Sequence, residues 1–188
     1  MDQSKYLEWL TKKLSQTNRV RFEERKVISL QEERSKFCIV INWTGLGAAA
    51  LVPNANLYPP WITSYYNFGP INGHPGYIIP NVDSVVVGGT CEENNASLAV
   101  ERKTTFEILE CAKILFPSLV DAPVMAEWVG LRPASDSIQL ECDESRKGFI
   151  IHCFGHGGAG VTLAMGCAED IVNQYVASAI IKLRDRKL

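Results

Sequence analysis

The sequence predicts a domain of the α/β or α+β class, and three kinds of segment carry that prediction. A short β-branched run at 37–41 is typical of a strand buried in a parallel sheet. The charged, amphipathic stretch 97–116 is typical of a helix. Between 148 and 162, an apolar run leads through a cluster of glycines into a second helical stretch. Strands and helices in mixed and alternating order favour this class.

Composition limits the function before any motif is considered. The chain has 188 residues, 46% of them hydrophobic and 21% charged, with a net charge of −2. That size fits one domain or an incomplete piece of a larger one. The near-neutral balance argues against a nucleic-acid partner, and the longest apolar run, 45–52, is far shorter than the roughly 20 residues of a membrane span. The first residues carry no apolar signal-peptide core, so we expect a soluble, intracellular protein.

The first quarter of the chain predicts one helix and two strands. Tyr6 to Leu14 has helical spacing, with Asn18 as the expected end. Val20 to Leu30 has strand character, and the buried strand 37–41 ends at the polar junction Asn42-Trp43-Thr44-Gly45. The following stretch, 53–75, is rich in Pro, Gly, Asn and Tyr and is expected to be dominated by loops.

The middle of the chain predicts a hairpin, a helix and further strands. Tyr77–Ile79 and Ser84–Val87 are expected to pair, with 80–83 as the turn. The helix 97–116 is expected to stop at Pro117. Further strands are expected at 124–129, 138–140 and 149–151.

The last segment, 160–186, predicts a long helix. One face of that helix should carry four residues that recur every four positions: Leu163, Cys167, Ile171 and Tyr175.

The six cysteines predict neither disulfides nor a metal site. They are scattered, without a C-x-x-C pair or a histidine spacing typical of zinc. Buried free thiols are the expected state of Cys38, Cys91, Cys111, Cys142, Cys153 and Cys167.

The glycine-rich segment matches the pattern of dinucleotide-binding turns, Gly155-x-Gly157-x-x-Gly160. Only 28 residues follow Gly160, too few for the second strand and the ribose-binding acid of an N-terminal Rossmann unit. Glycines nevertheless let the backbone approach a flat or anionic ligand, and a following helix presents its unpaired N–H groups there. A tight turn without a ligand is the alternative.

Two further residues have the chemistry to bind a carboxylate. Arg132, in Gly130-Leu131-Arg132-Pro133, follows an apolar run and can form a bidentate pair, although a solvated surface arginine is the simpler interpretation. Tyr77 begins a strand-like run, for which simple strand packing is the alternative.

Taken together, these segments resemble the D-amino-acid oxidase and D-aspartate oxidase family. Seven short sequence motifs occur in the order in which the family has them, from Tyr6 to the terminal helix: Tyr6-Leu7-Glu8-Trp9-Leu10, Arg25-Lys26-Val27, Asn42-Trp43-Thr44-Gly45, Tyr77-Ile78-Ile79-Pro80, Val87-Gly88-Gly89-Thr90, Gly130-Leu131-Arg132-Pro133 and Gly155-His156-Gly157-Gly158-x-Gly160. The resemblance implies FAD as cofactor and oxidation of a D-amino acid by dioxygen to a 2-oxo acid, ammonia and hydrogen peroxide.

The resemblance also implies roles for particular residues. Arg132 and Tyr77 would bind the substrate carboxylate, and the Gly158 carbonyl would accept a hydrogen bond from the substrate amino group. Cofactor contacts would come from Val27, Thr44, Gly157, Gly158, Gly160, Val161 and Thr162. No Arg or Lys occurs in 53–75 to bind a second carboxylate, which favours neutral over acidic substrates.

The resemblance further implies a division of the chain. Residues 1–52 would be part of an FAD-binding domain, 53–147 a substrate-binding mixed sheet, and 148–188 the C-terminal strand, glycine turn and helix of the FAD-binding domain. The N-terminal Rossmann βαβ unit would be missing, so these residues alone are expected to bind FAD weakly or not at all and to self-associate.

Several alternatives stay open. An inactive fragment acting as an interaction module and an unrelated α/β binding domain are the competing functions, and homo-oligomerisation is undecided. The ending Arg186-Lys187-Leu188 is similar to the peroxisomal address Ser-Lys-Leu, with the cytoplasm as the other expected location.

Overall fold

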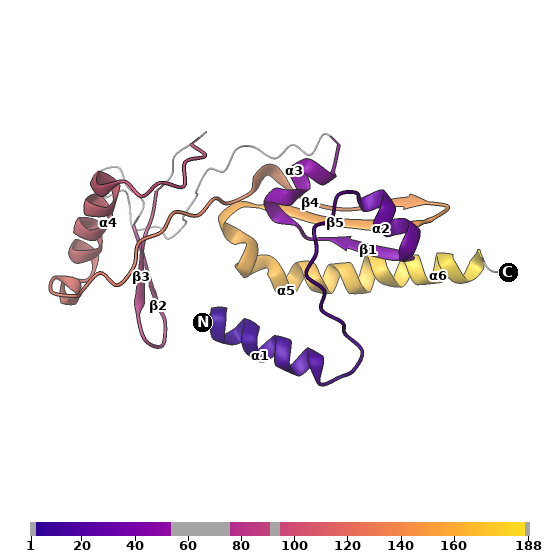
Figure 1. Cartoon of the computed structure of the whole chain (residues 1–188), viewed down its shortest axis with the longest axis horizontal. Coiled ribbons are helices and arrows are strands. Elements are labelled where there is room, and N and C mark those ends of the chain that lie inside the picture. Colours follow the sequence, from indigo (N-terminus) through magenta and orange to yellow (C-terminus); the bar gives the residue numbers. More distant parts are fainter. Residues whose placement is uncertain (1–2, 54–75, 91–94, 187–188) are drawn as a thin grey trace.

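The structure is a computed structural model that describes residues 3–53, 76–90 and 95–186 (Figure 1). Its elements form two groups, with the N-terminal helix α1 (Gln3–Ser15) beside them. We call the first group the sheet unit; it consists of α2 (Leu30–Lys36), β1 (Ile39–Asn42), α3 (Ala48–Leu51), β4 (Ala134–Ser145), β5 (Gly148–His156), α5 (Gly160–Asp170) and α6 (Ala177–Asp185). We call the second group the pocket unit; it consists of β2 (Tyr77–Pro80), β3 (Val85–Gly88) and α4 (Arg102–Leu115).

The sheet unit is built on β5, which lies between β1 and β4. β1 runs parallel to β5, with Ile39 opposite Phe149 and Asn42 opposite His152. β4 runs antiparallel to β5, and an irregularity in the register separates Ala134 from Gln139. Because β5 has neighbours on both sides, its residues from 148 to 155 are all buried. This arrangement confirms the parallel position predicted for the run 37–41, but its predicted burial is wrong, because Phe37, Cys38 and Ile41 are exposed.

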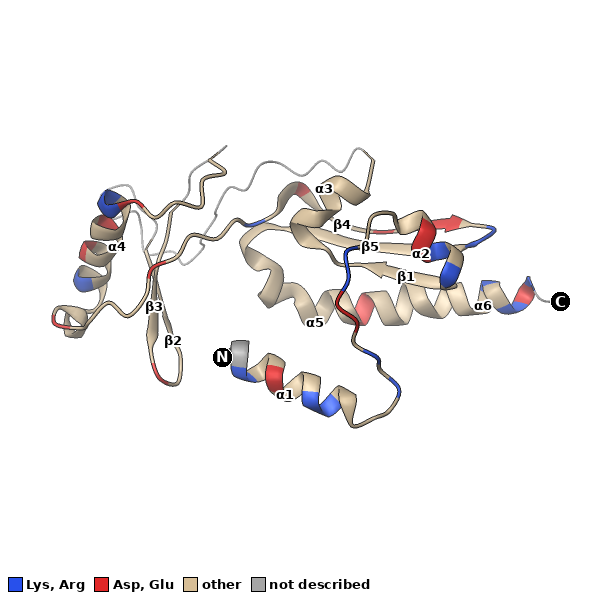
Figure 2. Ribbon diagram, in the orientation of Figure 1, with Lys and Arg blue, Asp and Glu red and all other residues tan. Residues whose placement is uncertain are grey.

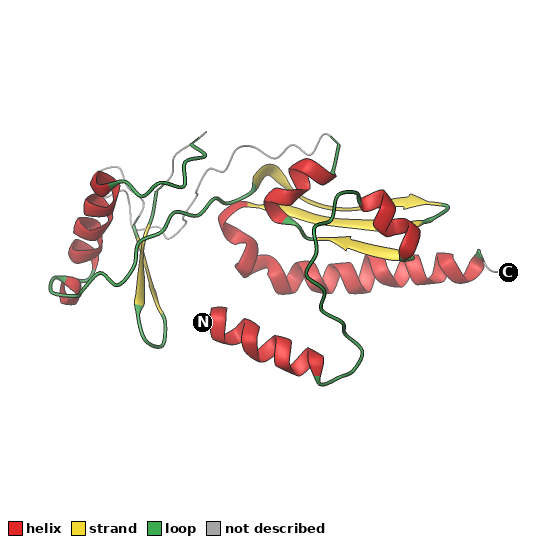
Figure 3. Cartoon of the chain, viewed as in Figure 1, coloured by secondary structure: helices red, strands yellow, loops and turns green. Residues whose placement is uncertain are grey.

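The C-terminal helix covers the sheet, as Figure 3 shows. It continues from α5 through a π-helical turn at Ile171–Val176 into α6. Cys167 and Ile171 are buried against Ile151 and Cys153 of β5, and Tyr175 packs against the same cluster, which confirms three of the four residues expected on one face. Tyr175 is half-buried, and its hydroxyl donates to the Leu140 carbonyl at 2.9 Å. Leu163 lies at the exposed margin of that face, because it is in the first turn of α5.

The pocket unit confirms the predicted hairpin and helix. β2 and β3 pair antiparallel, with Tyr77 opposite Gly88, and the Asn81 N–H donates to the Ser84 carbonyl at 2.8 Å in the turn. α4 packs on β3 and begins at Arg102, five residues later than the sequence pattern predicted. It ends at Leu115, before Pro117.

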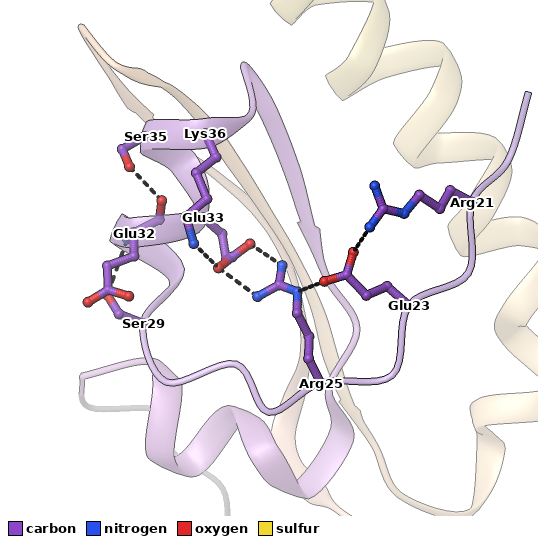
Figure 4. Close-up of polar contacts among 8 residues, drawn as sticks. All are labelled: Arg21, Glu23, Arg25, Ser29, Glu32, Glu33, Ser35 and Lys36. Carbon is purple, nitrogen blue, oxygen red and sulfur yellow. Dashed lines mark hydrogen bonds and ion pairs between the residues drawn. The ribbon is translucent and has the colours of Figure 1, made fainter.

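The strand predicted at Val20–Leu30 is wrong. Residues 20–29 form no strand, and Leu30 already begins α2, whose N-cap is Ser29. Charged side chains fill this segment, and Figure 4 shows them paired with one another and with α2. Arg25 donates to Glu33 of α2, at 2.9 Å for Nη1 to Oε1, and its Nε lies 3.2 Å from Glu23 Oε1. A β-ladder needs a neighbouring strand. This segment instead contacts α2 through ion pairs between side chains.

The strand predicted at 124–129 is also wrong. These residues form no strand, and Val124, Met125 and Trp128 are exposed. β-branched composition indicates a fit to a half-buried pleated surface, and here no described strand lies alongside. The strand predicted at 138–140 is confirmed as part of β4.

Some expectations concern residues outside the described part of the chain. These are the loop expected at 53–75, the thiol of Cys91 and the terminal Lys187-Leu188. Where the structure describes the chain, acidic and basic side chains are interspersed (Figure 2). No described helix has both the length and the apolar character to cross a lipid bilayer.

Candidate functional site

The pocket unit contains a cavity that brings together two of the predicted site residues. The cavity has a volume of about 440 Å³ and lies between β2, β3 and α4, and the segments 95–101 and 124–132 close it. Tyr77 and Arg132, which are 55 positions apart in the sequence, both line it. Thr90, Asn95, Ser97, Thr104 and Thr105 add polar groups, and Val86, Val87, Ile108, Leu109 and Trp128 add apolar ones. Apolar walls with a few polar groups are typical of a small-molecule site.

Tyr77 can lie in this cavity because a glycine faces it. Tyr77 pairs with Gly88 across the hairpin. A Cβ at Gly88 would lie 2.5 Å from both the Cζ and the Oη atoms of Tyr77, which is closer than real atoms approach. The glycine therefore gives the tyrosine ring its place over β3.

Arg132 is the one cation among the described residues that line the cavity. Its side chain is half-buried and forms no ion pair within the described part of the chain. The cavity's two carboxylates, Glu101 and Glu127, are both exposed. A guanidinium in this position can bind an anionic ligand through two parallel hydrogen bonds.

Pro133, the next residue, connects the cavity to the glycine turn. The Gly157 N–H donates to the Pro133 carbonyl at 2.7 Å. On another side, a Cβ at Gly45 would lie 3.6 Å from Cγ of Pro133, so the turn after Thr44 approaches the same proline. The structure therefore brings together three segments that the sequence singled out separately.

The glycine turn has the predicted order of strand, turn and helix. β5 ends at His156, a short 3-10 turn covers Gly157–Ala159, and α5 begins at Gly160. Gly155 and Gly157 have φ angles of +85° and +55°, and a Cβ at Gly155 would lie 2.0 Å from the Ser135 hydroxyl oxygen. Glycine is the residue that adopts this backbone without strain.

The N-terminus of α5 fits a flat, negatively charged group such as a flavin. Ala159, its N-cap residue, makes no side-chain hydrogen bond to the first N–H groups of the helix. Gly158, Val161 and Thr162 are exposed around this end. The helix dipole adds partial positive charge there.

Not all of the expected site residues meet. Gly158 lies in the turn and not among the described residues that line the cavity. Val27 is half-buried in the segment before α2 and lies outside the cavity lining as well. Thr44 is exposed at the end of β1, and its hydroxyl donates to Asn42 Oδ1 at 2.8 Å.

That hydrogen bond leads to two residues that the sequence did not single out. Asn42, only 1% exposed, lies opposite His152 in the parallel ladder. Their side chains interact at 3.0 Å between Nδ2 and Nδ1. Burial lowers the pKa of His152, which favours the neutral ring. In the sequence each directly follows an apolar run, 37–41 for Asn42 and 149–151 for His152, which is a signal that could have identified them.

A second cluster, at the base of the glycine turn, was also missed. Cys153, His156 and Cys167 each offer one donor atom, and these three atoms lie within 4.8 Å of one another. The sequence spacing predicted no metal site, because Cys167 comes from α5 and lies eleven residues after His156. The buried thiols expected from composition are confirmed for Cys111, Cys153 and Cys167, but Cys38 and Cys142 are exposed.

Comparison with known proteins establishes the class. Residues 1–174 match the family model of the FAD dependent oxidoreductases, and the chain belongs to that family. FAD is therefore the cofactor to which its family points.

Individual relatives agree with the resemblance found in the sequence. The chain is 39% identical to a D-amino acid oxidase of Dugesia ryukyuensis, over 79% of this chain and 48% of that protein. It is 34% identical to a D-amino-acid oxidase of Streptomyces coelicolor, over 90% of this chain and 56% of that protein. It is 28% identical to a human D-aspartate oxidase, over 95% of this chain and 55% of that protein. The chain thus spans about half the length of the curated relatives it matches.

A solved structure gives a weaker likeness. Glycine oxidase from Bacillus cereus matches with a TM-score of 0.47 and 24% identity, over 67% of this chain and 34% of that one.

Proposed function

We propose that this chain carries the substrate pocket and one side of the flavin site of an FAD-dependent D-amino-acid oxidase. One observation carries the proposal: Arg132 lines the cavity, while its neighbour Pro133 accepts a hydrogen bond from Gly157 of the glycine turn. A ligand held by Arg132 would therefore lie close to whatever the turn binds. The reaction would convert a D-amino acid, dioxygen and water into a 2-oxo acid, ammonia and hydrogen peroxide.

The chain's own contribution would be to bind and orient the substrate. The Arg132 guanidinium would form a bidentate pair with the α-carboxylate, and the Tyr77 hydroxyl would donate to the same group. The Gly158 carbonyl, on the turn, would accept a hydrogen bond from the amino group. Three such contacts define the direction of the Cα–H bond, and orientation of this kind accounts for much of an enzyme's rate acceleration.

The cofactor would lie against the glycine turn. Bound FAD would supply the chemistry that this chain's side chains lack, accepting hydride from the substrate and passing the electrons to dioxygen. The N-terminus of α5, whose N-cap residue makes no side-chain hydrogen bond, would stabilise negative charge on the reduced ring. We assign the contacts to Val27, Thr44, Gly157, Gly158, Gly160, Val161 and Thr162.

Neutral D-amino acids are the proposed substrates. An acidic substrate needs a second cation for its side-chain carboxylate. Among the described residues that line the cavity, Arg132 is the one cation, and 53–75 contain no Arg or Lys. The apolar residues Val86, Ile108 and Leu109 favour an aliphatic side chain.

The division into 1–52, 53–147 and 148–188 stays part of this proposal. The middle segment would form the substrate pocket, and it also contributes β4 to the sheet that ends in the glycine turn. Because both segments share this sheet, the pocket and the glycine turn would stay at a fixed distance from each other.

The test is a peroxide assay on the FAD-supplemented chain with D-alanine, L-alanine and D-aspartate. Because FAD binding by these residues alone is expected to be weak, the expectation concerns selectivity: any peroxide released should come from D-alanine, with little from D-aspartate and none from L-alanine. Preference for the L-enantiomer would contradict the proposal. Flavin binding without turnover would instead support the second candidate, an inactive chain that acts by association, which the exposed Ile41, Trp43 and Trp128 favour.

A further inference from the structure

The cluster of Cys153, His156 and Cys167 lies where the end of β5 faces the first turns of α5. The Nε2 atom of His156 is 3.6 Å from Sγ of Cys153 and 3.4 Å from Sγ of Cys167. Cys153 is fully buried and Cys167 is 8% exposed. The only polar partners of the ring nitrogen in the described part of the chain are thus two sulfur atoms.

These distances match those between ligands of one metal ion. Zinc binds sulfur at about 2.3 Å and imidazole nitrogen at about 2.05 Å, and a tetrahedral angle then puts the two ligand atoms about 3.6 Å apart. Both measured nitrogen–sulfur distances lie close to that value. The three atoms need little movement to share an ion.

The elements that supply the ligands support the same arrangement. Cys153 and His156 lie among the last four residues of β5, where pairing with β4 fixes the backbone. Cys167 comes from a helix packed on that sheet. The Trp43 ring stacks on His156, with centroids 6.3 Å apart and planes 10° apart, and so restrains the imidazole. Ligands held in advance lose little conformational entropy on binding.

The charges also suit a divalent ion. In its neutral form, the imidazole of His156 can coordinate through Nε2, the atom that faces both sulfurs. The thiols would lose their protons on binding, as thiol ligands do. One divalent ion, two thiolates and a neutral imidazole then sum to zero charge, the state least penalised by burial.

We propose that Cys153, His156 and Cys167 form a binding site for a thiophilic divalent metal ion, with zinc as the preferred occupant. Two sulfurs and one imidazole are the donor set that favours zinc over magnesium or calcium. Three protein ligands leave a fourth position open to water or a small ligand, because the described residues supply no other donor there. The ion would join β5 to α5 just before Gly157 and so restrain the glycine turn.

This inference does not rest on the proposed oxidase activity, and it can be tested without flavin. The reduced, metal-free chain is titrated with Co²⁺, which takes zinc sites and gives thiolate-to-cobalt charge-transfer absorption. We expect one equivalent of Co²⁺ to bind with that absorption, and Zn²⁺ to displace it. The titration is repeated on Cys153→Ser, His156→Gln and Cys167→Ala.

Each of these variants should bind Co²⁺ more weakly by more than about 100-fold, since losing a residue that only orients a ligand already costs about 10–100-fold. Cys38→Ser is the matched control, because Cys38 is exposed and lies outside the cluster, and it should bind like the parent. Circular dichroism of the metal-free variants verifies that each one folds. Alanine is used at Cys167 because it places a small apolar side chain in the core, where the hydroxyl of a serine could interfere with folding. Absence of thiolate–cobalt absorption in the parent would overturn the proposal. Equal binding by folded His156→Gln and the parent would overturn it too.

Discussion

The sheet unit and the pocket unit differ in how much of their structure is buried. In the sheet unit, eight consecutive residues of β5 are buried, and Phe149, Ile150, Ile151 and Phe154 have at most 2% exposure. In the pocket unit, β2 and β3 have four residues each, and only Gly88 of these eight is buried. The glycine turn is thus supported by a dense core, while the cavity is lined by thinly packed elements. The residues expected to stabilise the fold therefore lie mainly in the sheet unit, and the residues expected to contact a substrate lie mainly in the pocket unit.

The largest effect is expected from a cavity in the sheet unit. Ile151 is 0% exposed, so Ile151→Ala should lower the free energy of unfolding by about 2–5 kcal/mol. Ile79→Ala in β2, where the side chain is 40% exposed, should cost less than about 1 kcal/mol. Urea unfolding followed by circular dichroism measures both. Equal losses would mean that the two units are packed alike.

Arg132→Ala, beside the cavity, should weaken substrate binding and leave the stability of the fold nearly unchanged. Losing a bidentate pair with a carboxylate should cost about 2–4 kcal/mol of substrate binding, which appears as a raised KM. The free energy of unfolding should change by less than about 0.5 kcal/mol, because Arg132 forms no ion pair within the described residues.

Arg132→Lys provides the matched control for this charge. It should recover only part of the affinity, because an ammonium group cannot reproduce the planar fork of a guanidinium. Unchanged kcat/KM in both variants would show that Arg132 is an ordinary surface residue.

A smaller effect is expected from Gly88→Ala, which displaces the tyrosine without removing it. The new Cβ would lie 2.5 Å from the Tyr77 ring, so the ring must shift. A misplacement of about 1 Å can lower kcat/KM by up to about 100-fold. Gly166→Ala is the control, because nothing lies within 4 Å of a Cβ at that helical position. Unchanged kcat/KM for Gly88→Ala would exclude Tyr77 from substrate binding.

The smallest effect concerns pH and the ion pairs of the sheet unit. The hydrogen bond from Arg25, helped by Lys36, lowers the pKa of Glu33 from 4.5 to about 2. A carboxyl whose pKa is lower in the folded state stabilises the fold above its unfolded pKa. That contribution is therefore present above about pH 4.5 and disappears as the pH falls towards 2.

Glu33→Gln should remove this dependence. The parent should lose more stability than the variant between pH 4.5 and 2, as measured by thermal unfolding at several pH values. Glu24→Gln, at an exposed position of the same charged segment, should follow the parent. Parallel curves for Glu33→Gln and the parent would contradict the role of this ion pair.

Much of the local structure could be predicted from the sequence. The hairpin 77–88, the helix of α4 and the strand, turn and helix from 148 to 185 each follow from a pattern contained in about 10–35 neighbouring residues. The two failures, 20–30 and 124–129, were strands inferred from composition alone. A strand needs a partner, and a partner is not encoded in the strand's own residues.

The resemblance to the family, the choice of Tyr77 and Arg132, and the glycine turn all came from short local motifs in a recognisable order. Which of these residues lie close together became apparent only in the folded chain. The tertiary structure brought Tyr77 to the cavity of Arg132, joined Pro133 to Gly157, placed Asn42 against His152 and gathered Cys153, His156 and Cys167. The physical reason is that propensity and periodicity act along neighbouring residues. Contacts between distant residues arise from strand register and from the burial of apolar faces, which depend on the whole chain.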